Sequence, residues 1–312
     1  MDGTRPGKFV DPRITAKGET RAQVELRDPQ TLWFNTGTLC NIECANCYIL
    51  SSPTNDAFVY LTADEVSDYL AQLGERRWNV REIAFTGGEP FMNPQMIEMA
   101  RRPLAAGYEV LILTNAMRPM MRPRMRAGIE ALVSEHGDRL TFRVSLDHHD
   151  AAVHDRERGA GSFAKALEGM DWLASIGARL AVAGRIEMAE SEAEARAGYA
   201  ALYAARGYAI DAANPGETVL FPEMDERVEV PEITTECWGI LGKSPDSVMC
   251  ASSRMVVRRK GAERAAVLAC TLLPYDAQVE LGPTLADAER PVSLNHPHCA
   301  KFCVLGGASC SA

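Results

Sequence analysis

The sequence CNIECANCY at residues 40–48 carries three thiols, Cys40, Cys44 and Cys47, spaced four and three residues apart. It follows Thr31 to Asn35, a run that is typical of a β-strand. Thiolates this close together are suited to a soft metal centre. A structural zinc site or a fully ligated iron–sulfur cubane takes four protein ligands. Three thiolates therefore leave one metal position open, where a small molecule can bind.

A second feature, Thr86-Gly87-Gly88-Glu89-Pro90, lies one expected helix further along the chain. The apolar residues 83–85 before it predict a buried strand, and the glycine pair lets the backbone approach a ligand closely. Glu89 adds a carboxylate beside Pro90, which has no N–H of its own. Alone this is an ordinary turn, but its position relative to the cysteine loop indicates a shared site.

Together these two stretches resemble the radical S-adenosylmethionine (SAM) superfamily, whose cluster loop reads CxxxCxxC followed by an aromatic residue, here Tyr48. The resemblance implies a 4Fe-4S cluster on the three thiolates and SAM at the open iron, with Thr86 to Glu89 at its amino group. It also implies reductive cleavage of SAM to a 5′-deoxyadenosyl radical that abstracts hydrogen from an unactivated carbon. A structural zinc knuckle or a disulfide-bonded loop is the alternative.

Residues 31–221 alternate strand-like runs with helix-length amphipathic stretches, which predicts an α/β fold with a parallel sheet. The expected strands are residues 32–35, 82–85, 109–113, 140–146, 179–186 and 218–221, and the expected helices are residues 62–77, 94–106, 118–136, 162–176 and 191–206. The resemblance implies a partial (β/α)6 barrel. A doubly wound sheet has the same local pattern, so the choice rests on the resemblance.

Several polar residues fall at the carboxyl ends of the expected strands, where a parallel barrel binds its ligands. They are Asn115, Ser145, Asp147 and Arg185. By the resemblance, this set contacts SAM, with Ser145 at the ribose or carboxylate. Arg185 is expected at the carboxylate, where a guanidinium can form a bidentate pair.

The alternation stops near residue 222, and six further cysteines follow: Cys237, Cys250, Cys270, Cys299, Cys303 and Cys310. Two β-rich runs, residues 255–258 and 265–269, flank Lys260-Gly261 and predict a β-hairpin that brings Cys250 and Cys270 together. The chain is therefore expected to comprise an N-terminal arm (1–30), a barrel (31–221) and a cysteine-rich extension (222–312).

The C-terminal cysteines resemble the "twitch" or SPASM-like extension found in one branch of the superfamily. This implies one auxiliary 4Fe-4S cluster on Cys250, Cys270, Cys299 and Cys303, with Cys310 as the substitute for one of them. A structural zinc site on the same thiols is the alternative. Cys237 is left over, either as a catalytic thiol that donates a hydrogen atom or acts as a base, or as a buried apolar residue.

Composition limits the remaining classes. The 312 residues are 46% hydrophobic, which predicts a globular protein, and the net charge of -9 argues against nucleic-acid binding. No apolar stretch approaches the roughly 20 residues that span a bilayer, and the first 17 residues lack a signal-like apolar core. Clustered cysteines fit metal binding in a reducing compartment. A cytoplasmic protein without membrane partners is expected.

The resemblance implies an oxidoreductase or a lyase/cyclase, supplied with electrons by a low-potential donor such as flavodoxin or ferredoxin. Peptide-modifying relatives often carry an N-terminal peptide-binding domain, but only thirty residues precede Thr31. We therefore expect a small-molecule substrate, with a peptide maturase as the alternative. An iron–sulfur scaffold or electron carrier would explain the cysteines but not the residues 86–89.

Overall fold

The computed structural model describes residues 7–186, 190–222 and 228–306. Six parallel strands lie side by side in chain order, and each neighbouring pair is connected through helices. They are β2 (Thr31–Asn35), β3 (Glu82–Thr86), β4 (Glu109–Thr114), β5 (Leu140–Ser145), β6 (Arg179–Arg185) and β7 (Thr218–Phe221). A doubly wound sheet reverses its strand order part-way across, whereas this one does not. The partial (β/α)6 barrel is confirmed.

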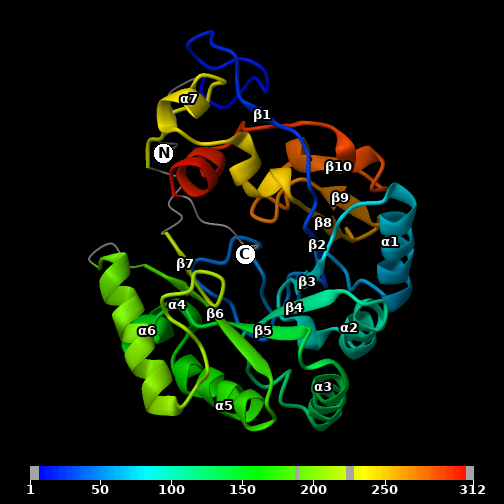
Figure 1. The fold of residues 1–312 in the computed structure, drawn as a ribbon, viewed down its shortest axis with the longest axis vertical. Helices are drawn as coiled ribbons and strands as arrows, with labels where there is room; N and C mark the ends of the chain where they lie inside the picture. Colours follow the sequence, from blue (N-terminus) through cyan, green and yellow to red (C-terminus); the bar gives the residue numbers. More distant parts are fainter. Residues whose placement is uncertain (1–6, 187–189, 223–227, 307–312) are drawn as a thin grey trace.

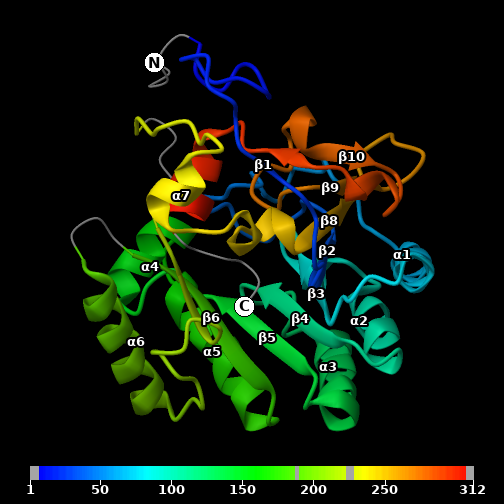
Figure 2. The same ribbon diagram turned by 45° about the horizontal axis from the view of Figure 1, so that its top comes forward.

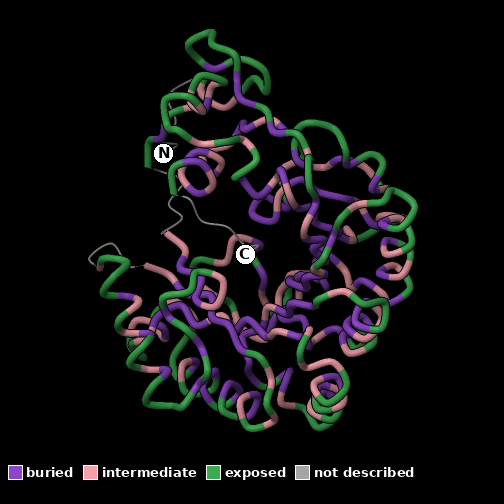
Figure 3. The backbone as a smooth tube through the Cα atoms, in the orientation of Figure 1, coloured by how far each residue is buried: buried purple, intermediate pink, exposed green. Residues whose placement is uncertain are grey.

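The connecting helices are α1 (Ala63–Arg76), α2 (Met96–Ala105), α3 (Pro123–His136), α4 (Ala151–Arg158), α5 (Ser162–Ser175) and α6 (Glu192–Arg206). All but α4 lie around the outside of the curved sheet (Figure 1). Buried residues follow the strands, and exposed ones follow the outer helix faces (Figure 3). Among the described helices, none is long and apolar enough to cross a membrane.

The expected C-terminal hairpin is present and continues the barrel sheet. Strand β8 (Ser253–Val257) pairs antiparallel with β9 (Ala266–Leu268), which pairs with β10 (Glu280–Gly282). On its other side β8 pairs parallel with β2, in the register Thr31↔Ser253. Backbone hydrogen bonds thus join the extension to the barrel. We keep residue 222 as a proposed boundary because the βα alternation ends there.

The N-terminal arm packs on the cysteine-rich region (Figure 2). Its strand β1 (Gln23–Val24) pairs antiparallel with β11 (Val292–Ser293). Apolar residues of the arm share a second, smaller core with α7 (Cys237–Leu241) and with a wide helix over Cys299–Leu305. The arm and the C-terminal extension therefore form one packed unit.

Candidate active site and auxiliary metal site

A large cavity opens at the carboxyl ends of the barrel strands, as the parallel fold dictates. It encloses about 1090 Å³ of empty space, part of it open to solvent. Its lining includes the predicted residues Cys40, Cys44, Cys47, Tyr48, Thr86, Gly87, Gly88, Asn115, Ser145, Asp147 and Arg185. One short stretch of chain and four strand ends thus converge on a single space.

The cysteine loop follows β2 and lies against α4. Ala45 N donates to Glu157 O over 2.9 Å, and Cys40 N donates to Ser52 O over 3.0 Å. Asn115, at the end of β4, places its Nδ2 3.9 Å from the Cys40 sulfur. Burial raises the pKa of Cys40 to about 12, so without metal this thiol stays protonated. A metal centre would have to displace that proton.

One histidine group has the close spacing of a single-ion site. Among the described residues, donor atoms from three side chains lie within 4.8 Å of one another only at His148, His149 and Glu190.

Hydrogen bonds already engage both ring nitrogens of His148 in this histidine group. His148 Nδ1 accepts from Asp150 N at 2.9 Å, so its Nε2 carries the proton and faces Glu190 Oε2 at 3.1 Å. A nitrogen that donates this hydrogen bond has no free lone pair for a metal.

The glycine pair allows two loops to touch. Gly87 has φ +142°, and a Cβ there would lie 2.6 Å from Gly37 O. At Gly88 a Cβ would lie 2.2 Å from Leu39 O, while Gly88 N donates to Gly37 O over 2.8 Å. Any side chain would push this turn away from the segment that leads into Cys40. The glycines therefore set the position of the cysteine loop as well as the space for a ligand.

Glu89 is turned away from the cavity. Its carboxylate accepts hydrogen bonds from Thr114 Oγ1 and Asn115 N, both 2.8 Å, and from Phe91 N at 3.2 Å. Burial raises its pKa to about 7, while these hydrogen bonds oppose the rise. The contact between Glu89 and the SAM amino group stays a prediction, and in this structure the carboxylate ties β3 to the end of β4.

Arg158 is a cavity residue that sequence reasoning did not select. Its Nε and Nη2 donate to the two oxygens of Asp147 over 2.7 and 3.0 Å, and Arg185 Nε lies 3.6 Å from the same carboxylate. Burial alone would raise the pKa of Asp147, but the Arg158 charge holds it below its ordinary value. The same guanidinium opposes the rise that burial causes in the pKa of Cys44. Asp147 thus orients two arginines beside the thiols.

A second cavity is lined by Cys250, Cys270, Cys299 and Cys303. Burial raises the pKa of Cys250 to about 12 and that of Cys299 well above its ordinary value. Four thiols around one hollow match the ligand number of a cubane cluster. The hairpin and the wide helix therefore bring together the four cysteines that the sequence singled out. Cys310 lies outside the described residues.

Leu272 lines both cavities, and Phe302 lies in the wall of the first one, stacked on Phe221 with ring centres 5.5 Å apart. The two hollows are thus neighbours with apolar side chains between them.

Residues 34–186 match the family described as the Radical SAM superfamily. The chain contains a radical SAM domain. As a radical SAM protein it uses a 4Fe-4S cluster and SAM, as the sequence predicted. Its C-terminal cysteines fit the branch with SPASM- or twitch-type extensions.

Three of these relatives have different named roles. The mycofactocin maturase MftC of Mycobacterium ulcerans is 32% identical over 49% of this chain and 38% of its own. The AdoMet-dependent heme synthase of Methanosarcina barkeri is 30% identical over 43% and 36%. AlbA of Bacillus subtilis, an antilisterial bacteriocin subtilosin biosynthesis protein, is 30% identical over 54% and 35%. The radical SAM chain thus aligns with little more than a third of each relative.

Solved structures share the fold. Streptococcus suis SuiB bound to S-adenosylmethionine has a TM-score of 0.58 at 11% identity and covers 82% of this chain and 63% of its own. Native anSMEcpe with bound AdoMet has a TM-score of 0.55 at 15% identity and covers 83% and 80%.

Cys237 does not line either cavity of the radical SAM protein. Its sulfur accepts from Thr234 N at 3.3 Å and lies 3.4 Å from Thr234 Oγ1, within the smaller core. The expectation of a catalytic thiol beside the substrate is therefore not supported, and the alternative of a packed cysteine fits the structure.

Replacing Cys237 by alanine is expected to leave SAM cleavage within about twofold of wild type, because the site loses two weak sulfur hydrogen bonds and little volume. Dithionite-driven formation of 5′-deoxyadenosine, measured anaerobically, checks this. A tenfold or greater loss in a variant that still carries its full iron content would restore Cys237 to the catalytic machinery.

Proposed function

We propose that the protein is a radical SAM peptide maturase of the oxidoreductase type. One observation supports the radical chemistry. The cysteine loop (residues 40–48), the glycine turn (residues 86–88) and Asp147 with its two arginines all line one cavity. The peptide class is supported by relatives named as a mycofactocin maturase and a bacteriocin biosynthesis protein. A fold neighbour, SuiB, has been solved bound to its precursor peptide SuiA. This replaces the small-molecule substrate that the short N-terminal segment suggested.

In this proposal Cys40, Cys44 and Cys47 hold the cluster, which when bound supplies the electron that cleaves SAM. Thr86 to Gly88 and Asn115 line the side of the cavity next to Cys40, where backbone groups can receive the amino group of SAM. Ser145 and Arg185 also line the cavity and are proposed to contact the SAM carboxylate or ribose. Arg185 lies beside the cysteine loop, where its Nη2 donates to Asn46 O over 2.9 Å. Arg158 keeps Asp147 ionised and places a fixed positive charge near the Cys44 thiolate.

The auxiliary site is proposed to hold a second 4Fe-4S cluster on Cys250, Cys270, Cys299 and Cys303. Leu272 lines both this site and the active-site cavity, so the two sites are neighbours. We propose that the auxiliary cluster takes up an electron from the oxidised substrate. A flavodoxin- or ferredoxin-like protein is proposed as the external electron donor.

The substrate class can be identified from the source of the hydrogen atom that the 5′-deoxyadenosyl radical abstracts. Cells that contain the protein are grown in deuterated medium, and their extract is separated into a peptide fraction and a small-metabolite fraction. Each fraction is incubated with the reduced enzyme and unlabelled SAM, and the 5′-deoxyadenosine is analysed by mass spectrometry. Deuterium that comes from the peptide fraction, and disappears after protease treatment, is the expected result. Deuterium that comes from the metabolite fraction would overturn the peptide assignment.

A small-molecule oxidation remains the second candidate because the heme synthase relative is as similar to this chain as AlbA is. The same labelling experiment separates the two.

A further inference from the structure

The N-terminal arm forms part of the auxiliary cysteine cavity. Pro12 lines this cavity together with Ser293 and Leu294 of the C-terminal strand. The Ser293 hydroxyl donates to Pro12 O, and Leu294 N donates to Ala22 O over 3.0 Å. The arm is thus hydrogen-bonded, on both sides of its loop, to the strand that supplies the outer lining of the cavity.

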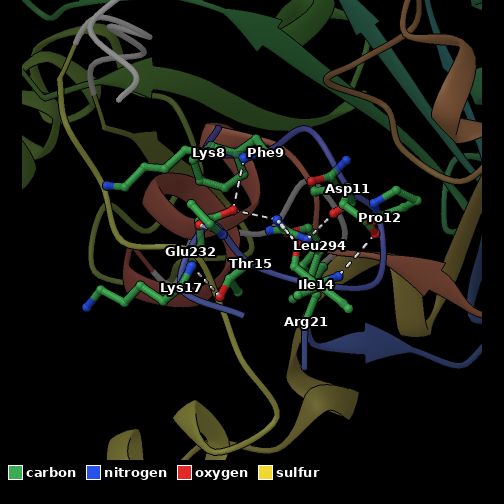
Figure 4. A network of polar contacts seen from close by, with 12 residues as sticks. Lys8, Phe9, Asp11, Pro12, Ile14, Thr15, Lys17, Arg21, Glu232 and Leu294 are labelled. Atoms are coloured by element: carbon green, nitrogen blue, oxygen red, sulfur yellow. Dashed lines mark hydrogen bonds and ion pairs between the residues drawn. The ribbon is translucent and has the colours of Figure 1, made fainter. Parts of the chain in front are cut away.

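Arg21 is the centre of these contacts (Figure 4). Its side chain is fully buried, and each of its three nitrogens donates a hydrogen bond to the backbone. Nε bonds Asp11 O at 2.9 Å, Nη1 bonds Leu294 O at 3.4 Å, and Nη2 bonds Ile14 O at 3.2 Å. One guanidinium therefore connects two points of the arm loop to the strand beside the cavity.

Glu232 provides the negative charge that pairs with Arg21. Its carboxylate forms a buried ion pair with Arg21 and is only 6% exposed. It also accepts from Phe9 N at 2.9 Å and from Ala16 N at 2.7 Å. A buried carboxylate with three donors and a buried guanidinium with four acceptors form a satisfied network, and removing one charge leaves the other uncompensated.

The network also reaches the cysteines. Ala22 and Val24 pack with Ala300 and Val304 of the wide helix, in a core that contacts Cys250, Cys299 and Cys303. Apolar packing thus joins the arm to two of the segments that carry the metal ligands.

We propose that the arm, residues 7–24, is the outer wall of the auxiliary metal site and that Arg21 and Glu232 are positioning residues that hold this wall closed. The wall would keep water, chelators and oxidants from the iron, while Leu272 and Phe302 face the active-site cavity on the inner side. The inference rests on the auxiliary cluster of the proposed function. It concerns only the access of solvent to that cluster, and not the identity of the substrate.

The test uses the full chain with Cys40, Cys44 and Cys47 replaced by alanine, so that the auxiliary cluster is observed alone. After anaerobic reconstitution, the rate at which the iron chelator bathophenanthroline removes iron is followed by absorbance. Arg21→Met is expected to raise this rate roughly tenfold or more, because opening of the wall becomes easier. Arg27→Met is the matched control, since Arg27 is 61% exposed in its pairs with Glu25 and Asp246.

A double variant, Arg21→Met with Glu232→Gln, removes both charges and leaves no orphan ion if the single variant does not fold. It is expected to lose iron faster than wild type as well, because the hydrogen bonds to residues 11, 14 and 294 are gone. The proposal would be overturned if folded variants lose iron at the same rate as the parent protein, in which Cys40, Cys44 and Cys47 are replaced but Arg21 and Glu232 are kept.

If the protein with Cys40, Cys44 and Cys47 replaced binds no iron, the proposal of an auxiliary cluster is wrong. The closure of the wall is then tested by the accessibility of the thiols that line the cavity. Alkylation of Cys250 and Cys299 by iodoacetamide, read by mass spectrometry, should then be roughly tenfold faster in Arg21→Met than in Arg27→Met. Equal rates of alkylation would overturn the wall.

Discussion

Replacing Gly88 by alanine should abolish SAM cleavage by displacing the cysteine loop. The new Cβ would lie 2.2 Å from Leu39 O and 2.7 Å from Thr38 O, both of them backbone atoms that cannot rotate away. Relief requires separation of the glycine turn from residues 37–39, which lead directly into Cys40. We expect incomplete iron incorporation, loss of SAM binding by roughly tenfold or more, and about 1–3 kcal/mol of lost stability.

Gly74→Ala is the matched control for this change. Gly74 lies in α1 with nothing within 4 Å of an added Cβ. Alanine there should raise the free energy of unfolding by up to about 1 kcal/mol through its helix propensity and leave SAM binding unchanged. Wild-type SAM binding in Gly88→Ala would contradict the contact between the two loops. Iron content, calorimetric SAM titration and thermal unfolding provide the three readouts.

Replacing Arg158 by glutamine should have the largest effect of any single charge. Asp147 would lose two hydrogen bonds of 2.7 and 3.0 Å while it stays buried, with Arg185 Nε 3.6 Å away. Breaking a buried pair in this way costs about 3–5 kcal/mol. Because Asp147 and Arg185 then shift, we expect SAM cleavage to fall by about a hundredfold or more, as when substrate-positioning groups are lost.

The stability difference between wild type and Arg158→Gln should depend on pH. Arg158 helps to hold the pKa of Asp147 below its ordinary 3.8, so the stabilisation from the pair is present above pH 4 and is lost as the pH falls through the folded pKa. Denaturant unfolding of the metal-free proteins should therefore show a gap that is widest near neutrality and narrows below about pH 4. A gap independent of pH would contradict the assigned pairing.

Arg156→Gln controls for the loss of a positive charge on the same helix. Arg156 is 55% exposed, and its distance to Glu157 is 3.5 Å. Such a pair contributes at most about 1 kcal/mol, so this variant should behave like wild type in both assays.

The sequence was sufficient where the informative residues are close together. The spacing of Cys40, Cys44 and Cys47 is fixed by the chain itself. The expected helix over residues 62–77 is present as α1, and its start is set locally by hydrogen bonds of 3.2 and 2.9 Å between Thr62 and Glu65. The six barrel strands were found for the same reason, since each is a short apolar run between turn residues.

Other features depend on contacts that no local pattern records. Helix α4 buries only His154, so it lacks the apolar stripe that predicts a helix, and Arg158 at its end was passed over as a site residue. Glu89 has the right residue type at the right place, but its direction is set by donors 25 and 26 residues away. The ion pair of Arg21 and Glu232 joins residues 211 positions apart. Local periodicity carries no information on such pairings.

The most direct test of the account is an iron count after anaerobic reconstitution, combined with a dithionite assay for 5′-deoxyadenosine. Three proteins are compared: wild type, the variant with Cys40, Cys44 and Cys47 replaced by alanine, and the variant with Cys250, Cys270, Cys299 and Cys303 replaced. We predict about eight irons in wild type and about four in each variant, as expected for two 4Fe-4S clusters. 5′-Deoxyadenosine should be lost only in the first variant. Iron in the wild type that stays bound when Cys40, Cys44 and Cys47 are replaced, with 5′-deoxyadenosine still formed, would contradict the assignment of the SAM-binding cluster.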